Sequence, residues 1–441
     1  MRNWANRAMS HVRWQWLRRH YGTALMRSRL IWPGWYRLRY PDVARSAMDP
    51  LAHYIRFGAG ERRVPSLLFN GNRYLDDNPD LAESGVNPLL HYVVHGQREG
   101  RVIHPVMPAR GGAVADGLNR ILHHPGVGTP ELSIVMPIRN ASAFIHASLP
   151  SILGQTGCVA EIVISDDRSD DDTLTQAAGI VASYRGPHAV TLFQTPSRLG
   201  IDHLATLVET VSQDWIVQAH GDDVSCPHRA FRLLTLHRQT GASLIGSRAV
   251  NPDTKLLYPV TQSIAGPGWL PLEAWIKTPM SVLSGALNAF SRLIYSVFPR
   301  LDSEYAPVGH DSIQPFRASL LGGVWYTDEV LVGWTSHDGQ WSRQLTDPRT
   351  LETRSFGFAI RRLGVLRVMR QDLAHAAAAG IVSPQEAMTI GAALDEAGTY
   401  LLEQALAAKE KLNRLHLEFL WVPREHLKDA VPLPQPAKRS L

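Results

Sequence analysis

Short apolar segments alternate with segments of helical length from residue 131 onward, and this alternation limits the possible folds more than any other feature of the chain. Four apolar segments, at 132–136, 161–165, 190–194 and 215–219, have the length of buried strands. Helix-length intervals between such strands are typical of β–α–β units with parallel strands. The sequence therefore predicts an α/β domain with a mostly parallel sheet over residues 130–345.

The N-terminal residues 1–35 form a basic arm. Residues 1–40 contain nine arginines, five tryptophans and no acidic residue. Such a segment can lie on an anionic membrane surface. It can equally be a solvated extension whose tryptophans pack against the next domain. Both interpretations stay open at this point.

A repeat with a period of 38 residues occupies residues 36–105. The motif Tyr-Pro-Asp-Val at 40–43 returns as Asn-Pro-Asp-Leu at 78–81, and His53 and Gly58 return as His91 and Gly96. Each copy predicts two short helices: Pro-Asp opens the first, and Asp-Pro or Asn-Pro begins the second, which ends at a glycine. The histidines lie at helical spacing among apolar residues, without an acid at ligand spacing, which favours packing over metal binding.

The remaining segments have simpler patterns. Residues 106–129 are rich in Gly, Ala and Pro and predict a linker, residues 346–430 predict a helical region, and residues 431–441 predict a loose tail. Two cysteines are too few for a disulfide framework, and there is no run of about 18 apolar residues. We expect a cytoplasmic protein, peripheral at the inner membrane face if the arm binds lipid. A net charge of +5 does not by itself indicate a nucleic-acid partner, and we expect none.

Polar residues follow the predicted strands, at the sheet edge where ligands collect in open α/β domains. Asp166 and Asp167 begin an acidic run after the second strand, and Asp222 and Asp223 follow the fourth. Adjacent buried carboxylates are costly unless a cation or hydrogen bonds compensate them. Mg²⁺ and Mn²⁺ prefer carboxylate and phosphate oxygens, so the second pair predicts a cation site. A capped turn is the alternative interpretation.

Three further residues stand at strand-to-helix turns. Pro137 ends the first strand, and Asn140 can cap the helix that follows it. Arg198 precedes a glycine at another helix entry, where a cation can face phosphate groups. Taken singly, these residues are also compatible with ordinary turns.

In their joint order and spacing these motifs resemble glycosyltransferase family 2 over about residues 131–345. The segment 132–140 is similar to the first strand and turn of the family, and 166–171 to its nucleoside-binding segment. The pair at 222–223 is similar to its metal-binding motif, with His220 where many relatives have an acid and Arg168 where Gly or Asn is usual. Later segments at 309–311 and 337–342 resemble the regions of its catalytic base and its closing loop. The resemblance implies the GT-A nucleotide-sugar-binding fold, and the repeats resemble those found beside bacterial glycosyltransferases of surface-polysaccharide synthesis.

The resemblance also implies a function. It implies an inverting transfer of a sugar from a nucleotide-sugar donor to a glycan or lipid-linked acceptor in surface-polysaccharide synthesis, with Mg²⁺ or Mn²⁺ as cofactor. Because the chain has no membrane span and no Gln-x-x-Arg-Trp sequence, we expect non-processive addition. The implied roles are a catalytic base at Asp311, metal ligands at Asp223 and His337, and donor contacts at Pro137, Asn140, Asp166, Asp167, Arg198 and Asp222.

Three alternatives stay open. A catalytically silent protein with the same fold could bind a nucleotide or a glycan, and the departures at Arg168, His220 and Gly309 are compatible with it. A nucleotidyltransferase would have a glycine-rich basic loop after the first strand, whereas residues 137–142 read Pro-Ile-Arg-Asn-Ala-Ser. The repeats could also be a scaffold for neighbouring enzymes, alongside catalysis.

Overall fold

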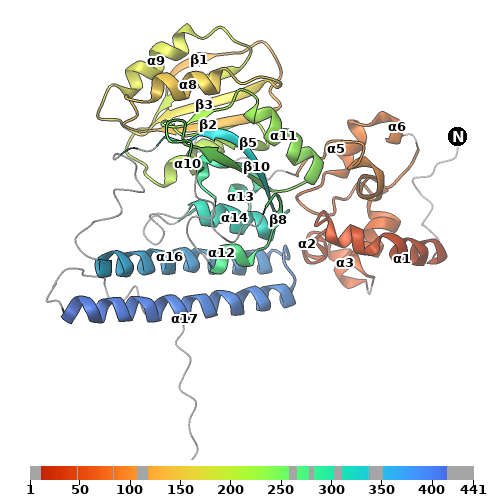
Figure 1. Cartoon of the computed structure of the whole chain (residues 1–441). Coiled ribbons are helices and arrows are strands. Elements are labelled where there is room, and N and C mark those ends of the chain that lie inside the picture. Colours follow the sequence, from red (N-terminus) through yellow and green to blue (C-terminus); the bar gives the residue numbers. More distant parts are fainter. Residues whose placement is uncertain are drawn as a thin grey trace, which may run out of the picture.

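A computed structural model describes residues 11–46, 48–82, 84–106, 118–257, 266–277, 283–301, 310–335, 337 and 351–414. Several predictions fall partly or wholly outside these residues: the start of the arm at 1–10, part of the linker at 107–117, the closing segment at 338–342, residues 346–350 and 415–430 of the helical region, and the tail at 431–441. Figure 1 shows N-terminal helices, a sheet domain and a long helical hairpin. Among the described residues, no helix is both long and apolar enough to span a membrane.

A ten-stranded sheet forms the centre of the molecule. Its strands are β1 (Asn119–His124), β2 (Leu132–Ile138), β3 (Ala160–Asp166), β4 (Ala189–Gln194), β5 (Trp215–Gln218), β6 (Val224–Ser225), β7 (Leu244–Val250), β8 (Gly268–Leu270), β9 (Asn288–Ser291) and β10 (Val324–Gly333). They follow the order β1-β4-β3-β2-β5-β9-β7-β10-β6, and β8 pairs with β10. The central strands β4, β3, β2 and β5 are parallel, as are β7 and β10. The predicted fold class, an α/β domain with a mostly parallel centre, is confirmed.

Antiparallel strands complete the sheet. Strand β9 lies between β5 and β7 and is antiparallel to both, and β1, β6 and β8 pair antiparallel at the edges. Strand β1 lies in the segment predicted as a linker, so that part of the prediction is wrong. Its residues are mostly exposed, because an edge strand has a solvated side and needs no apolar period.

Helices cover both faces of the sheet. They are α8 (Ile145–Leu153), α9 (Thr173–Ser183) and α11 (Arg229–Thr240) on one face, and α10 (Asp202–Thr210), α13 (Leu293–Ser296) and α14 (His310–Leu320) on the other. Short elements α12 (Glu273–Lys277) and η5 (Gly285–Leu287) lie between β8 and β9 in the chain. Alternate residues of β2 serve the two faces, since Ile134 packs with α8 and Val135 packs with α10. The two cores hold the carboxyl ends of the central strands in a fixed arrangement.

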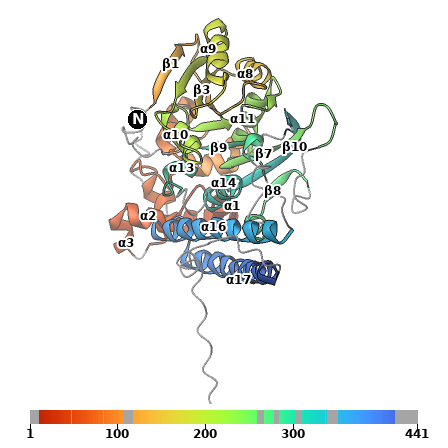
Figure 2. The same ribbon diagram turned by 90° about the vertical axis from the view of Figure 1, so that its left-hand side faces the viewer.

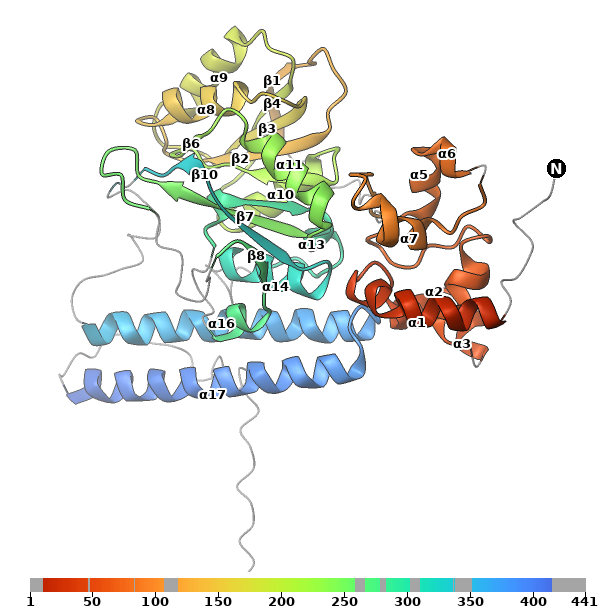
Figure 3. The ribbon, with the colours of Figure 1, turned by 45° about the vertical axis from the view of Figure 1, so that its right-hand side comes forward.

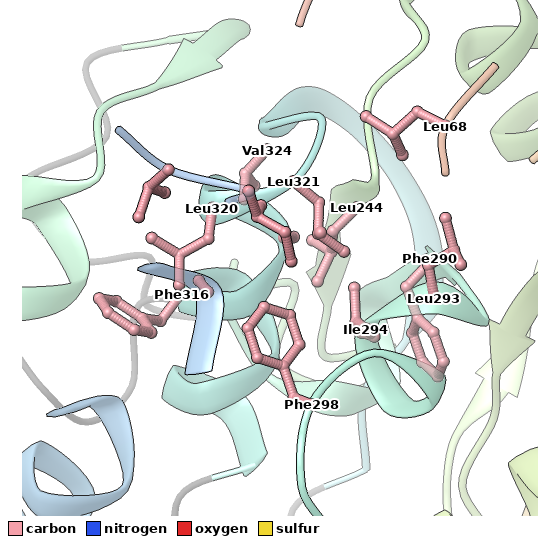
Figure 4. Close-up of a cluster of buried hydrophobic side chains, with 14 of the residues drawn as sticks. Leu68, Leu244, Phe290, Leu293, Ile294, Phe298, Phe316, Leu320, Leu321 and Val324 are labelled. Carbon is pink, nitrogen blue, oxygen red and sulfur yellow. The ribbon is translucent and has the colours of Figure 1, made fainter. Parts of the chain in front are cut away.

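A helical hairpin, α16 (Leu351–Ala378) and α17 (Pro384–Arg414), lies beyond α14 (Figure 2). Phe298, Phe316 and Leu320 belong to the core between the sheet and this hairpin (Figure 4). A buried ion pair fixes the junction: Arg317 of α14 donates two hydrogen bonds, of 2.7 and 2.9 Å, to the carboxylate of Asp372 of α16. The hairpin therefore anchors the helix that begins at residue 310.

The N-terminal region consists of short helices. They are α1 (His11–Arg27), α2 (Pro33–Arg39), α3 (Pro41–Arg45), α4 (Pro50–His53), η2 (Tyr54–Gly58), α5 (Gly71–Asp76), α6 (Pro79–Ala82), α7 (Pro88–His91) and η3 (Tyr92–Gly96). The side chains of Asp49 and Asn87, 38 residues apart, cap α4 and α7 in the same way, because each accepts a hydrogen bond from a backbone amide three residues later.

This region packs beside α11 and the end of the hairpin (Figure 3). The amide of Trp35 donates to the carbonyl of Gly380 at the α16–α17 turn (2.8 Å), and Gln97 Nε2 donates to the carbonyl of Gln239 in α11 (3.1 Å). The N-terminal helices therefore contact the sheet domain on a side away from the carboxyl ends of its strands.

Candidate active site

The acidic pair predicted as a cation site follows β5 at the centre of the sheet. All four residues of β5 are buried, and the chain turns sharply at Gly221. A side chain at this glycine would approach the Cβ of Ala141 to 3.0 Å, so the turn packs closely on the loop after β2. The carbonyl of Gly221 accepts a hydrogen bond of 2.7 Å from Ser148 Oγ in α8. The position of the acids is thus fixed by backbone packing.

Three side chains of this turn form a cluster. The ligand atoms of His220, Asp222 and Asp223 all lie within 4.8 Å of one another. Asp223 is 8% exposed, and its burial together with the charge of Asp222 raises its pKa to about 6. Two crowded carboxylates of this kind fit a divalent cation, which would offset their repulsion. The donor set therefore fits Mg²⁺ or Mn²⁺, as the sequence predicted.

The segment after β10 closes over the same acids. The amide of Thr335 donates a hydrogen bond of 3.0 Å to Asp223 Oδ1, and His337 Nε2 lies 3.1 Å from Asp222 Oδ2. The imidazole of His337 packs against the ring of Phe144, with 4.3 Å between centroids. His337 is therefore at the acidic pair, although it is more than one hundred residues away in the chain.

Asp311 lies in the first turn of α14 and faces this cluster. Its Oδ1 accepts a hydrogen bond of 2.8 Å from the amide of Gly285. A Cβ at Gly285 would come within 3.0 Å of Asp311 Oδ1 and 2.6 Å of Gln218 Nε2, so both side chains converge on this glycine. Gln218 Nε2 in turn lies 3.0 Å from His220 Nε2. The structure thus brings Asp311 into the same site as the acidic pair.

Burial raises the pKa of Asp311, while the charge of His220 and the amide of Gly285 lower it. A carboxylate with a raised pKa is a better proton acceptor than a solvated one. His220 therefore interacts with Asp311 as well as with Asp223. The site consequently contains a group suited to accept a proton beside a group suited to hold a cation.

The predicted nucleoside-binding acids lie at the end of β3, and both are buried. Asp166 accepts hydrogen bonds from the backbone and hydroxyl of Ser169. Asp167 accepts from the backbone amides of Leu199 (2.7 Å) and Gly200 (2.9 Å) in the loop after β4. These bonds shape the loops around the sheet edge, and the contact of either carboxylate with a base or ribose stays a prediction.

Other predicted donor contacts surround these loops. Asn140 has a left-handed backbone conformation (φ 45°), and its Oδ1 accepts from the amide of Asp170 at 2.9 Å. This bond joins the loop after β2 to the loop after β3. Pro137 is half-buried in β2, and Arg198 is exposed on the loop after β4. The structure places all three at the carboxyl edge of the sheet, and their contact with a donor is not tested.

Several residues of the site have no signal in the sequence. Gln218, Gly285 and Phe144 carry no motif of their own, and each contacts a partner distant in the chain: Gln314, Asp311 and His337 respectively. Arg229 is fully buried in α11 and donates to the carbonyls of Gln218 (2.8 Å) and Ala286 (2.6 Å). The proximity of its charge to Asp223 lowers the pKa of that acid and so favours the ionised form. A basic residue six positions after the acidic pair was the one hint that the sequence offered.

Residues 133–298 match the family model described as glycosyl transferase family 2. This part of the chain is similar to glycosyltransferase family 2 domains. The match includes β2, the acids after β3 and the cluster after β5, and it ends before Asp311 and His337. Together with the described sheet and its covering helices, the match confirms the predicted GT-A type of α/β fold.

Two curated proteins align with this chain over about one hundred residues each. One is the putative glycosyltransferase EpsE of Bacillus subtilis, which is 32% identical over 100 residues, covering 23% of this chain and 36% of EpsE. The other is an uncharacterized protein of Mycobacterium tuberculosis, which is 36% identical over 99 residues, covering 22% of this chain and 30% of that protein. The chain thus spans about a third of the length of these relatives.

Two solved structures also resemble the chain at low identity. Residues 1–349 of S. aureus TarS in complex with UDP-GlcNAc align with a TM-score of 0.48 and 15% identity, over 68% of this chain and 81% of that one. The mannosyltransferase PcManGT from Pyrobaculum calidifontis, in complex with GDP-Man and Mn²⁺, aligns with a TM-score of 0.39 and 17% identity, over 69% and 80%.

Proposed function

We propose that the chain transfers a sugar, with inversion at the anomeric carbon, from a nucleotide-sugar donor to a glycan or lipid-linked acceptor. The observation that carries the proposal is the convergence of three carboxylates, Asp222, Asp223 and Asp311, around His220. A cation holder and a proton acceptor at one sheet edge are the two groups that such a transfer needs.

The donor half of the site is the acidic pair with the segment that closes on it. Asp222 and Asp223 would hold the cation, and His337 lies where it can reach the same cation or the diphosphate. A bound divalent cation neutralises negative charge on the departing nucleoside diphosphate. Asn140 and Asp167 would shape the nucleoside pocket through the loops that they join.

The acceptor half is Asp311. Its carboxylate takes the proton of the acceptor hydroxyl while that oxygen forms a bond to the anomeric carbon. The bond from this carbon to the diphosphate oxygen breaks on the opposite face, and the electron pair leaves with the nucleoside diphosphate. The Gly285 amide donates a hydrogen bond of 2.8 Å to one carboxylate oxygen of Asp311, and the other oxygen would accept the proton.

The acceptor and the cellular setting are part of the proposal. We assign the chain to non-processive addition in bacterial surface-polysaccharide synthesis, where acceptors are often carried at the membrane. One face of α1 fits an anionic membrane, since Trp16, Arg19, Met26 and Arg27 are exposed within one arc of the helix, while Leu17 and Leu25 pack inward. The first acid of the chain is Asp42, so no carboxylate of α1 opposes binding.

Vesicle cosedimentation tests this face. The triple variant Trp16→Ser/Arg19→Ser/Arg27→Ser should release the full chain from phosphatidylserine vesicles. It keeps Leu17 and Leu25, which pack inward. Binding that is absent in the parent chain, or unchanged in the variant, would remove the membrane contact from the proposal. Transfer to a soluble acceptor should not depend on this outcome.

A screen of nucleotide sugars tests the activity itself. UDP-, GDP- and dTDP-sugars are added to the purified chain with and without Mn²⁺, and the unfolding temperature and the release of nucleoside diphosphate are both measured. One donor class should raise the unfolding temperature in a cation-dependent way, since a ligand bound to the native state stabilises it. Release of diphosphate supports catalysis. Binding without release, even with glycan acceptors present, would favour the catalytically silent alternative.

A further inference from the structure

The two repeats differ in how they fill the space beside an arginine near the end of each copy. In the first copy, the guanidinium of Arg63 lies 4.8 Å from the centre of the Tyr40 ring. The hydroxyl of Tyr40 accepts a hydrogen bond of 3.0 Å from the amide of Val64. In the second copy, Asn78 stands in place of the tyrosine, and its side-chain oxygen accepts a bond of 2.7 Å from Arg101. A short amide thus replaces an aromatic ring.

A second side chain is smaller in the same part of the second copy. Arg62 and its counterpart Gly100 both have a left-handed backbone, with φ of 56° and 69°. A Cβ at Gly100 would meet no atom within 4 Å, so close packing does not require a glycine there. The first copy shows that an arginine fits the same backbone. The two exchanges together leave room at this end of the second copy.

A cavity of about 390 Å³ occupies this end of the second copy, and Asn78, Gly100 and Arg101 line it. Arg238 of α11 completes its wall from the sheet domain, which lies beside this copy (Figure 3). Gln97 donates a hydrogen bond of 3.1 Å to the backbone carbonyl of the residue after Arg238, and this bond holds the two sides together. The volume is within the range of small-molecule sites.

The wall of the cavity contains both donors and acceptors of hydrogen bonds. Arg101 and Arg238 can only donate, whereas the amide of Asn78 can donate and accept. The carboxylate of Asp77 accepts, and it lies 2.8 Å from Nε2 of His104. This carboxylate would repel an inorganic anion, and an apolar ligand would leave the polar groups unpaired. A ligand with many hydroxyl groups suits such a wall, because each hydroxyl both donates and accepts.

We propose that this cavity binds a saccharide unit of a glycan, at a site separate from the one that transfers the sugar. Arg238 donates a hydrogen bond of 3.0 Å to Glu131, the residue before β2, so the cavity lies toward the amino ends of the central strands. The acidic pair lies at their carboxyl ends. A long acceptor held at both sites would bind more tightly than at either site alone. The inference rests on the proposed function, because the glycan would be its acceptor.

Saturation-transfer nuclear magnetic resonance of the purified full chain tests this binding without an activity assay. The probes are maltotetraose, chitotetraose and a tetrasaccharide of alternating glucuronate and N-acetylglucosamine. The decisive variant is Asn78→Tyr/Gly100→Arg, which gives the second copy the residues of the first and so fills the cavity. The matched control is Tyr40→Asn/Arg62→Gly, which makes the converse exchange in the first copy, outside the cavity.

We expect at least one probe to bind the parent chain, to bind the control equally, and to lose its signal in Asn78→Tyr/Gly100→Arg. Arg238→Gln keeps both repeats intact and removes one charged donor from the wall. It should weaken binding of the same probe by about tenfold, the effect of one hydrogen bond from a charged group. Near-ultraviolet circular dichroism of each variant establishes that it is folded, and Arg238→Gln decides the question if the filled variant does not fold.

Failure of all three probes to bind the parent chain would overturn the inference. An equal signal in the parent chain and the filled variant would also overturn it, because the glycan would then bind elsewhere. Displacement of the bound glycan by inorganic phosphate would show an anion site instead of a saccharide site.

Sugar transfer separates this inference from the proposed function. The filled variant should transfer sugar to a monosaccharide acceptor at the parent rate, because the cavity lies away from Asp311. Glycan binding that is lost in the filled variant, in a chain that transfers no sugar, supports the cavity and refutes the proposed function. Transfer by a chain whose cavity binds no glycan refutes the cavity and leaves the proposed function intact.

Discussion

The histidines of the N-terminal repeats and the histidines of the acidic site occupy opposite kinds of surroundings. In the repeats, Nδ1 of His53 lies 3.1 Å from the hydroxyl of Tyr36, and Nδ1 of His91 lies 3.0 Å from the hydroxyl of Tyr74. In the site, His220 and His337 lie beside carboxylates. The two repeat histidines therefore have neutral phenol partners, whereas the site histidines have charged ones.

Histidine therefore has two roles in this molecule, one in packing and one in the acidic site. A hydrogen bond between neutral groups fixes a fold, and its geometry recurs wherever the fold recurs. The repeat glycines show the constraint, because a Cβ at Gly58 or Gly96 would collide with the hydroxyl of Tyr36 or Tyr74. An imidazole beside carboxylates can instead share a cation or a proton with them. If the two regions differ in this way, substitutions in the repeats should change stability, and substitutions in the acidic site should change sugar transfer.

The largest effect is expected from Asp311→Asn. Loss of the proton acceptor should reduce sugar transfer by about 10²–10⁴-fold, while donor affinity stays near that of the parent because the acidic pair is intact. Transfer is measured by nucleoside diphosphate release, and donor binding by calorimetry. The comparison variant is His53→Gln, which should transfer at the parent rate per folded molecule. Normal turnover in Asp311→Asn would remove that residue from the chemistry.

A smaller effect is expected from Asp223→Ala. Removal of this buried carboxylate takes away a cation ligand and leaves the Thr335 amide without its acceptor. Donor affinity in Mn²⁺ should fall by about 10–100-fold, and donor affinity in a chelator should change little. Calorimetric titration of the donor in the two conditions measures both. An equal Mn²⁺ response in parent and variant would place the cation elsewhere.

The repeats should respond in stability and not in catalysis. Gly96→Ala pushes on the hydroxyl of Tyr74 and should lower the free energy of unfolding by about 1–3 kcal/mol. The matched control is Gly179→Ala in α9, where no atom lies within 4 Å of the added methyl and a helix gains about 0.5–1 kcal/mol. Denaturant unfolding measures both variants. A fall in the turnover of folded Gly96→Ala would contradict a purely structural role.

The smallest effect is a pH dependence of the repeats. Burial lowers the pKa of His53 and of His91. The unfolded chain then binds protons at these residues below about pH 6.5 while the folded chain does not, so stability falls as the pH drops through that value. The paired variant His53→Gln/His91→Gln should lose less stability than the parent between about pH 7 and pH 5.5. Parallel losses in the two chains would show that other groups dominate.

Much of the sheet could be predicted, because its central strands are buried on both faces. The expected strands at 132–136 and 161–165 lie within β2 and β3, and each contains a run of three apolar residues that marks it. Strands β7, β9 and β10 carry buried residues mixed with Ser, Asn and charged residues, so no continuous apolar run marks them. The edge strand β1 is mostly exposed, so it has no alternating apolar pattern by which the sequence could predict it.

The site likewise contains some residues that the sequence marks and others that it does not. Asp222, Asp223 and Asp311 stand in motifs, the pair directly after β5 and Asp311 in the first turn of α14. The contacts of Gln218 with Gln314 and of Gly285 with Asp311 depend on how segments far apart in the chain pack together, which no local spacing encodes. Both carboxylate oxygens of Asp167 accept hydrogen bonds from backbone amides. The binding of a nucleoside by this residue therefore stays a prediction.

The central claim is that the acidic pair and Asp311 form one site for a cation and a donor. A crystal structure of the full chain with Mn²⁺ and a nucleoside diphosphate, with data collected at the manganese absorption edge, tests this claim directly. The account predicts an anomalous peak bonded to Asp222 or Asp223 and to the diphosphate, with the Asp311 carboxylate facing the open side of the diphosphate. A manganese peak bound at another surface, or a diphosphate remote from Asp311, would contradict the account.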